Sequence, residues 1–220
     1  MKVILFGATG MVGQGALREC LFSSDVSNVL TVGRSLTGQQ HAKLREITQK
    51  DLSNLAAIEG DLQGYDACFF CLGVSSTGMR EQDYTRVTHD LTLAVARTLL
   101  KVNPGMTFIY VSGTGTDSSE KGRSMWARVK GRTENDLLKL GFKSAYMFRP
   151  GYIQPLDGIK TKTRVYAMMY AVLGPFYPLL KTVAPQLVTT TRQVGKAMIQ
   201  VALHGAAKTH LENRDINQIA

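Results

Sequence analysis

The chain opens with residues 1–13, Met1-Lys2-Val3-Ile4-Leu5-Phe6-Gly7-Ala8-Thr9-Gly10-Met11-Val12-Gly13. Residues 3–6 form a short apolar run, which is typical of a strand buried on both faces of a parallel sheet. Glycine then recurs at every third position, and residues 14–21 carry apolar side chains at helical spacing. The opening therefore predicts a strand, a tight turn and a helix in direct succession.

A glycine-rich turn of this kind is suited to hold the phosphates of a dinucleotide. We expect Gly7 to allow the tight turn, Gly10 to let the backbone approach a pyrophosphate, and Gly13 to let the helix lie close to the strand. The N-terminus of the helix would offer unpaired N–H groups and a partial positive charge to the anion. The spacing is G-x-x-G-x-x-G instead of G-x-G-x-x-G, and a purely structural turn is the alternative interpretation. The residues expected around the phosphates are Gly7, Thr9, Gly10, Met11, Val12 and Gly13.

Strand and helix patterns alternate along the rest of the chain. Further strands are expected at residues 29–35, 43–48, 66–73, 107–112 and 145–148, and further helices at 52–58, 81–101, 133–140 and 191–204. Six such alternations predict an α/β fold with a Rossmann-like, doubly wound parallel sheet. Since no linker or break in composition divides residues 1–220, we expect a single domain.

The end of the second expected strand carries Arg34 and Ser35 and no carboxylate. In dinucleotide-binding sheets an acidic residue at this place receives the ribose 2′-hydroxyl of NAD, whereas an arginine accommodates the 2′-phosphate of NADP. The sequence therefore favours NADP(H), with NAD(H) left open. The alternative is a surface arginine that contacts no ligand.

Two further strand ends are expected beside the cofactor. Asp51-Leu52 follows the third strand, where Asp51 would accept a hydrogen bond from the adenine amino group or cap the helix 52–58. The fourth strand ends in Cys71-Leu72-Gly73. Cys68 and Cys71 form a C-x-x-C inside that strand, where residues three apart point to opposite faces, so we expect buried thiols and no metal site.

The composition limits the classes of partner. An excess of 26 basic over 17 acidic residues gives a net charge of +9, but no nucleic-acid-binding motif accompanies it, so we do not expect nucleic-acid binding. The three cysteines suggest no disulfide framework, and the N-terminus lacks a signal-peptide pattern. These features predict a cytoplasmic protein. No stretch reaches the length of a membrane span.

These features together resemble the short-chain dehydrogenase/reductase superfamily, in its extended and atypical branch of NAD(P)-dependent epimerase/dehydratase-like proteins. Within that branch the chain is most similar to small relatives of the mammalian Tat-interacting, NADPH-binding protein. The motifs that carry the resemblance are residues 7–13, Gly33-Arg34, Asp51-Leu52, residues 71–73, Tyr110-Val111-Ser112, Val129-Lys130-Gly131-Arg132-Thr133-Glu134 and Phe148-Arg149-Pro150-Gly151.

The resemblance implies a catalytic serine, a tyrosine, and a lysine four residues after the tyrosine. Ser112 matches the serine, which orients the substrate oxygen, and Lys130 matches the lysine, which also holds the nicotinamide ribose. The tyrosine position is occupied by Trp126, and an indole N–H cannot cycle a proton as a phenol does. The resemblance also places Pro150 and Gly151 beside the cofactor.

Two functions remain open from the sequence. The first is an NADP-dependent oxidoreductase or epimerase-like enzyme of unknown small-molecule substrate, in which another group or water handles the proton. The second is a non-catalytic NADPH-binding redox sensor that acts through a protein partner.

The resemblance implies that residues 152–220 contribute a small lobe that binds a substrate or a partner. Its apolar segment 165–180 would pack inside the lobe, line a pocket, dip into a membrane surface, or bind a protein partner or a second copy of the chain.

Overall fold

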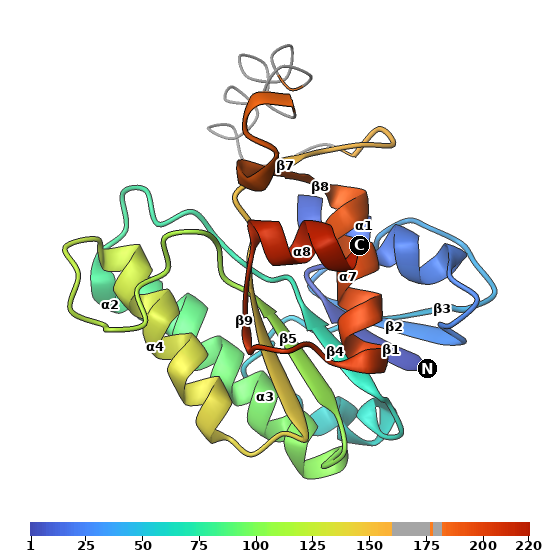
Figure 1. The fold of residues 1–220 in the computed structure, drawn as a ribbon. Coiled ribbons are helices and arrows are strands. Elements are labelled where there is room, and N and C mark those ends of the chain that lie inside the picture. The colour runs from blue at the N-terminus through green and yellow to red at the C-terminus, as the bar shows by residue number, and fades with distance from the viewer. Residues whose placement is uncertain (160–176, 178–181) are drawn as a thin grey trace.

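The protein folds around a seven-stranded parallel sheet with helices on both faces (Figure 1). The computed structural model describes residues 1–159, 177 and 182–220. In spatial order the strands are β3 (Leu44–Thr48), β2 (Asn28–Gly33), β1 (Lys2–Phe6), β4 (Ala67–Phe70), β5 (Thr107–Val111), β6 (Ser144–Arg149) and β9 (His210–Glu212). This arrangement confirms the Rossmann-like fold expected from the alternating pattern.

Two groups of helices cover the sheet, as Figure 1 shows. On one face lie α1 (Met11–Phe22) and α7 (Thr191–His204), with α8 (Asn213–Ile219) beside α7. The other face is covered by η1 (Ala56–Leu62), α2 (Glu81–Thr85), η2 (Arg86–Asp90), α3 (Leu91–Val102) and α4 (Met125–Lys139). The small remaining elements are β7 (Tyr152–Gln154), η4 (Pro185–Leu187) and β8 (Val188–Thr190), and β7 pairs with β8.

The apolar run of β1 divides its side chains between the two cores. Val3 and Leu5 pack with α1 and α7, whereas Ile4 and Phe6 pack with the helices of the other face. All four side chains are fully buried, because both faces of a parallel sheet are covered. The sequence pattern of β1 and its central place in the sheet therefore have the same cause.

Helices α1 and α7 touch directly through glycine. A Cβ atom on Gly15 would lie 2.7 Å from the Cβ of Thr191, and one on Gly195 would lie 3.0 Å from the carbonyl oxygen of Gly15. Glycine at both positions lets the two backbones approach each other. This contact fixes the C-terminal helix against the first helix of the fold.

The structure corrects several expected element boundaries. The helix expected over residues 52–58 is absent from this part of the described chain, and a 3₁₀ helix begins instead at Ala56. The helix expected to continue over residues 133–140 begins at Met125 and ends at Lys139. The helix expected over 81–101 is one helical run that passes through a π-helical stretch at 86–90.

Three strands were not expected from the sequence. β7, β8 and β9 have three residues each, which is too short for a periodic pattern to be recognised. Within residues 152–220, α7 packs on the main sheet and β9 extends it at the edge of β6. The apolar segment 165–180 lies, apart from Tyr177, outside the described residues.

The two thiols of the C-x-x-C, Cys68 and Cys71, lie in different cores. Cys68 belongs to the core on the α3–α4 face and Cys71 packs against the core on the α1–α7 face, so the two thiols do point to opposite sides. Burial raises the pKa of both thiols. In the described parts of the chain, no helix combines the length and apolar character needed to cross a membrane.

Candidate functional site

The residues expected to form the site lie at one edge of the sheet. Because all seven strands are parallel, the residues that follow β1, β2, β4, β5 and β6 emerge at the same, carboxyl-terminal edge. The strand order reverses between β1 and β4, which opens a crevice at that edge in sheets of this kind. The topology therefore gathers segments that are up to about 140 residues apart in the chain, from Gly7 to Gly151.

The turn after β1 has the geometry that its glycines imply. Gly7 has a φ of +82°, and its carbonyl oxygen accepts a hydrogen bond from the Gly10 N–H at 2.9 Å. A Cβ atom on Gly7 would lie 2.7 Å from the backbone of Cys71, and one on Gly13 would lie 2.1 Å from the Gly7 carbonyl oxygen. Helix α1 therefore lies close against the end of β1, at a distance that only glycine permits.

The N-terminus of α1 is left without a side-chain cap. Gly10 is the N-cap residue, and the first turn contains no acidic side chain. The first N–H groups of a helix have no partner within it, so this end offers hydrogen-bond donors and a partial positive charge. Gln14 Nε2 donates to the Thr9 carbonyl oxygen at 3.1 Å and braces the turn from the side. The arrangement can bind an anion.

Arg34 and Ser35 follow β2 as exposed residues. Among the residues with described positions, Arg34 forms no ion pair. The carboxylate of Glu46, on the neighbouring strand β3, accepts hydrogen bonds from other donors. Its Oε2 accepts from Thr31 Oγ1 at 2.9 Å and from the Thr37 N–H at 3.0 Å. The guanidinium is therefore available at the edge of the sheet.

Asp51 lies past the end of β3 as an exposed residue, and Leu52 beside it is buried. Asp51 Oδ1 accepts from the Ser53 N–H at 2.9 Å and from Ser53 Oγ at 2.6 Å, and these hydrogen bonds lower the pKa of the carboxyl. The interpretation of Asp51 as the cap of a helix 52–58 is wrong, because the aspartate closes a local turn.

The ends of β4 and β6 complete the edge. Cys71 and Leu72 are partly buried and Gly73 is exposed after β4. Past β6, the carbonyl oxygen of Pro150 accepts from the Thr114 N–H, and the Gly151 N–H donates to Asn213 Oδ1, both at 2.9 Å. These bonds tie the β6 end to the loop after β5 and to α8.

The structure brings Ser112 and Lys130 together. Ser112 directly follows β5 and is buried, and Lys130 of α4 donates a hydrogen bond from Nζ to the Ser112 carbonyl oxygen. Burial lowers the pKa of Lys130 to about 8, although the nearby Glu134 carboxylate works in the opposite direction. Trp126, one helical turn before Lys130, is partly buried, and its ring lies 3.5 Å from where a Cβ of Gly115 would be.

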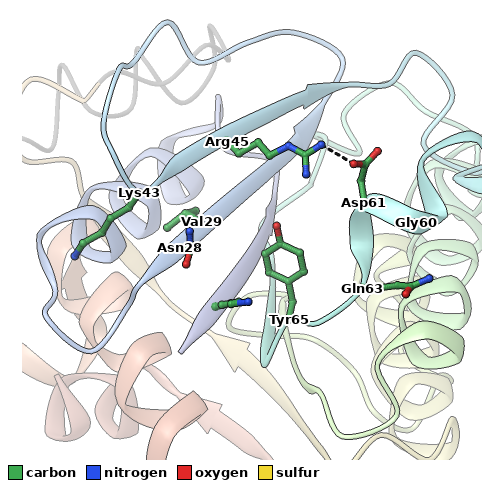
Figure 2. A pocket seen from close by; sticks show the side chains of 9 residues that line it. Asn28, Val29, Lys43, Arg45, Gly60, Asp61, Gln63 and Tyr65 are labelled. Carbon is green, nitrogen blue, oxygen red and sulfur yellow. Dashed lines mark hydrogen bonds and ion pairs between the residues drawn. The ribbon is translucent and has the colours of Figure 1, made fainter.

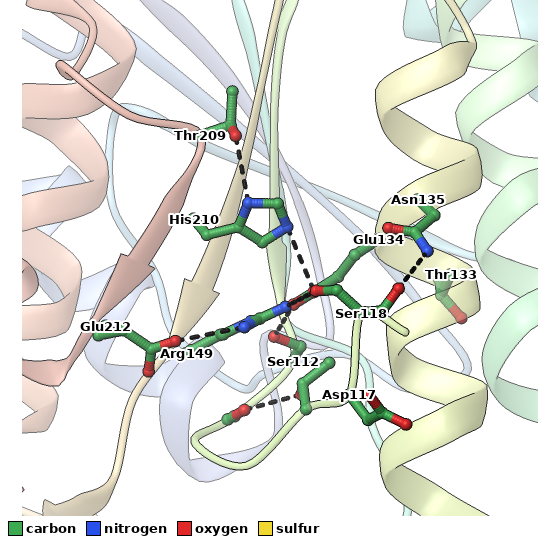
Figure 3. A network of polar contacts seen from close by, with 12 residues as sticks. Ser112, Asp117, Ser118, Thr133, Glu134, Asn135, Arg149, Thr209, His210 and Glu212 are labelled. Atoms are coloured by element: carbon green, nitrogen blue, oxygen red, sulfur yellow. Dashed lines mark hydrogen bonds and ion pairs between the residues drawn. The ribbon is translucent and has the colours of Figure 1, made fainter. Parts of the chain in front are cut away.

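The hydroxyl of Ser112 points into the protein. It donates to Glu134 Oε1 at 2.5 Å and lies 3.2 Å from the Phe148 carbonyl oxygen (Figure 3). Two residues further along this loop, Thr114 is exposed, and its Oγ1 donates to the Arg149 carbonyl oxygen at 2.9 Å. This geometry does not favour the expectation that the Ser112 hydroxyl orients a substrate.

Glu134 is the centre of a buried polar network that the sequence alone did not reveal (Figure 3). Its carboxylate is completely buried and binds the Arg149 guanidinium through Nε at 3.0 Å and through Nη2. Arg149 also donates to Ser118 Oγ at 2.5 Å and to Glu212 Oε1 at 3.3 Å. His210 Nε2 lies 3.5 Å from Glu134 Oε2. The network ties α4, β6, β9 and the loop after β5 into one unit.

A signal for this network was present in the sequence. Arg149 ends an otherwise apolar strand, and Glu134 follows Lys130 by one helical turn on the side of α4 that faces the sheet. A charged residue is rarely buried without a partner of opposite charge. What the sequence could not provide was the pairing between residues on separate elements.

A separate hollow of about 340 Å³ opens at the opposite, amino-terminal edge of the sheet (Figure 2). Two of its cations already have partners, since Arg45 pairs with Asp61 at 2.5 Å and Lys43 donates to the Ser23 carbonyl oxygen at 2.6 Å. It contains neither a glycine turn nor a helix N-terminus. Its lining residues are Lys2, Asn28, Val29, Lys43, Arg45, Gly60, Asp61, Gln63 and Tyr65. Across the described ranges, no three His, Cys, Asp or Glu residues are grouped so as to hold a metal ion.

Curated relatives match over most of the chain. The mitochondrial protein fmp52-2 of Aspergillus terreus is 26% identical over 200 residues, which cover 90% of this chain and 85% of that protein. Protein HTATIP2 of Rattus norvegicus is 29% identical over 154 residues, which cover 69% of this chain and 62% of that protein, or less than two thirds of its length. The second match confirms the expected relationship to the group of the Tat-interacting protein.

One expectation is corrected by these relatives. Several fungal proteins that match, from Aspergillus terreus, Scheffersomyces stipitis and Emericella nidulans, are named as mitochondrial. The cytoplasmic location expected from the cysteines and the N-terminus is therefore contradicted. Cysteine usage reports the redox conditions of a compartment and does not distinguish one reducing compartment from another.

Solved structures and a family model agree on the class. The dTDP-glucose 4,6-dehydratase DesIV of Streptomyces venezuelae, solved with NAD and TYD bound, superposes with a TM-score of 0.71 at 15% identity, covering 100% of this chain and 80% of that one. At this identity the likeness shows the fold alone. The model of the NAD dependent epimerase/dehydratase family matches residues 3–122, which is more than half of the chain. The chain therefore belongs to the NAD-dependent epimerase/dehydratase family and has its NAD(P)-binding, short-chain dehydrogenase/reductase-like fold.

Proposed function

We propose that the protein binds NADP(H) at the carboxyl-terminal edge of the sheet and uses it in an oxidoreductase reaction on a small carbonyl compound. The single observation that carries the proposal is the uncapped N-terminus of α1, which Gly7 and Gly13 hold against β1. At the end of the neighbouring strand lies the exposed guanidinium of Arg34, which forms no ion pair with any described residue. A diphosphate and a 2′-phosphate are the anions that fit these two groups.

The other strand ends would hold the remaining parts of the nucleotide. Asp51 and Leu52 would lie against the adenine, and Ser35 would share the 2′-phosphate with Arg34. Residues 71–73, Pro150 and Gly151 would line the path toward the nicotinamide. The ammonium of Lys130 would contact the nicotinamide ribose, since it lies at the end of β5. Bound NADPH would supply a hydride to a carbonyl carbon.

The proton for such a reaction would come from a source other than a serine–tyrosine pair. Trp126 cannot release its indole proton at physiological pH, and the Ser112 hydroxyl is engaged with Glu134. Water is the proton source that this edge leaves open.

Trp126 and Ser112 also support a second candidate function. A site that binds NADPH but lacks the phenol and a free serine hydroxyl would suit a redox sensor that reports the nucleotide to a protein partner. The apolar segment 165–180 is then the proposed contact with that partner or with a second copy of the chain.

Binding and turnover measured on one preparation would separate these functions. Calorimetry on ligand-free protein should show binding of NADPH and weaker binding of NADH. Loss of NADPH absorbance with aldehydes and ketones would support the enzyme. Binding without turnover, together with a complex that forms only in the presence of NADPH, would support the sensor. Absence of binding to either nucleotide would reject both.

A further inference from the structure

Ser112 is held by two residues of α4 at once. Its carbonyl oxygen accepts from Lys130 Nζ, and its hydroxyl donates to Glu134 Oε1 at 2.5 Å. Lys130 and Glu134 are four residues apart in α4, so they lie on the same face of the helix. The three residues therefore form a closed arrangement in which the end of β5 bridges one turn of α4.

The Glu134 carboxylate is itself fixed from the other side. Arg149 binds the carboxylate through two nitrogen atoms. The Glu134 side chain is 0% exposed to solvent and the Arg149 side chain is 11% exposed. A carboxylate held by a bidentate guanidinium keeps a defined orientation. The position of the Ser112 carbonyl therefore depends on a chain of contacts that begins at β6.

We propose that Glu134 is a positioning residue for Lys130: through Ser112 and Arg149 it fixes the lysine ammonium at the end of β5 and supports its positive charge. The part of this inference that concerns nucleotide binding rests on the proposed function. Glu134 would act without touching the nucleotide. Ser112 would serve as the bridge and would not orient a substrate.

The charges around Lys130 give this inference a measurable consequence. Burial lowers the pKa of Lys130 to about 8, and the Glu134 carboxylate raises it. The charged and titratable groups that face the carboxylate from the neighbouring elements are Tyr110 of β5, Arg149 of β6 and His210 of β9. Glu212 of β9 lies on the far side of Arg149. Replacement of Glu134 by an uncharged residue should therefore let Lys130 lose its proton at a lower pH.

The first experiment follows Lys130 in the free protein by NMR of 13C-labelled lysine across a pH series. Glu134→Gln should move the Lys130 inflection down by about 1 pH unit, because an opposite charge nearby is removed. Glu134→Asp, which keeps the negative charge, should leave the Lys130 inflection close to its wild-type pH. Glu59→Gln, which breaks the exposed pair of Glu59 with Lys101, is the matched control and should leave the inflection in place. An unchanged inflection in Glu134→Gln would overturn the proposal.

The second experiment measures NADPH affinity over the same pH range. In the wild-type protein the affinity should fall as the pH passes through about 8, and in Glu134→Gln the fall should begin at lower pH. If the wild-type protein binds no NADPH, the proposed function fails while the NMR titration still tests the positioning.

A milder substitution guards against misfolding of Glu134→Gln. Ser112→Ala removes only the hydroxyl and leaves the pair of Glu134 and Arg149 intact. It should weaken NADPH binding severalfold, whereas Glu59→Gln should not. Equal NADPH affinity in Ser112→Ala and the wild-type protein would count against the proposal.

Discussion

The Ser112 hydroxyl and the Glu134 carboxylate, 22 residues apart in the chain, are joined by a hydrogen bond of 2.5 Å in the interior of the protein. This bond directs the hydroxyl away from the carboxyl-terminal edge of the sheet, where a substrate would be bound. The resemblance predicts Trp126 at the position of the usual tyrosine, and an indole N–H does not release its proton at physiological pH, so we expect proton transfer from neither residue. At the end of β1, the positive φ of Gly7 and the close approach of Gly13 to the Gly7 carbonyl oxygen agree with the turn expected from the sequence.

The pair of Arg149 and Glu134 should contribute strongly to stability. Arg149→Met leaves a fully buried carboxylate without its counter-charge, and breaking such a pair costs about 3–5 kcal/mol. Arg80→Met, which breaks the exposed pair with Asp83, should cost at most about 1 kcal/mol. Denaturant unfolding of both variants measures the difference, and equal losses would contradict the assignment of Arg149 to a buried network.

Gly13 should tolerate no side chain. Gly13→Ala puts a Cβ atom 2.1 Å from the Gly7 carbonyl oxygen, so α1 must shift, and overpacking of this kind costs about 1–3 kcal/mol. Gly60→Ala is the matched control, because no heavy atom lies within 4 Å of the new Cβ. Thermal unfolding should show a lower midpoint for Gly13→Ala only. Equal midpoints would mean that α1 does not lie as close to β1 as described.

Arg34 should determine the preference between the two nucleotides. Arg34→Ala removes a charged donor to the 2′-phosphate, which is worth about 1.5–3 kcal/mol, so NADPH affinity should fall roughly tenfold or more. NADH affinity should stay nearly constant, because NADH lacks that phosphate. Arg45→Ala, at the opposite edge of the sheet, is the control and should change neither affinity. Parallel losses for NADPH and NADH would show that Arg34 does not read the 2′-phosphate.

Lys130 should make stability depend on pH in the alkaline range. Its pKa is about 8 in the folded protein, against about 10.4 for an unfolded lysine. Between these values the unfolded state binds more protons, so rising pH stabilises the folded state through this group. The stability of the wild-type protein relative to Lys130→Met should therefore rise from pH about 8 to about 10. Urea unfolding at several pH values measures it.

The control for that experiment is Lys101→Met, which removes a lysine at an exposed position. A difference between the wild-type protein and Lys130→Met that stays constant from neutral to alkaline pH would contradict the lowered pKa of Lys130. The same result would remove the support that this shift gives to the positioning role of Glu134.

The fold could be predicted because its causes are local in the sequence. The apolar run of residues 3–6 and the glycines at 7, 10 and 13 each indicate one element, and parallel topology then brings the strand ends together. Cys68 and Cys71 were also predictable, since the alternation of a strand puts them on opposite faces.

The network around Glu134 could not be predicted, because it depends on contacts between distant elements. Glu134, Arg149 and His210 come from α4, β6 and β9, and β9 is too short to be recognised from its pattern. The direction of the Ser112 hydroxyl is a side-chain property that residue type and spacing do not determine. Motif matching placed Ser112 after the fifth strand, and it could not show that the hydroxyl is turned toward Glu134.

We propose that NADP(H) binds at the carboxyl-terminal edge of the sheet with its diphosphate on the N-terminus of α1. The most direct measurement is a crystal structure of the protein with NADPH. We predict density for the diphosphate against residues 7–13, with the 2′-phosphate within hydrogen-bond distance of Arg34. Nucleotide bound elsewhere, for example in the hollow lined by Arg45 and Tyr65, with the α1 N-terminus left empty, would contradict the account.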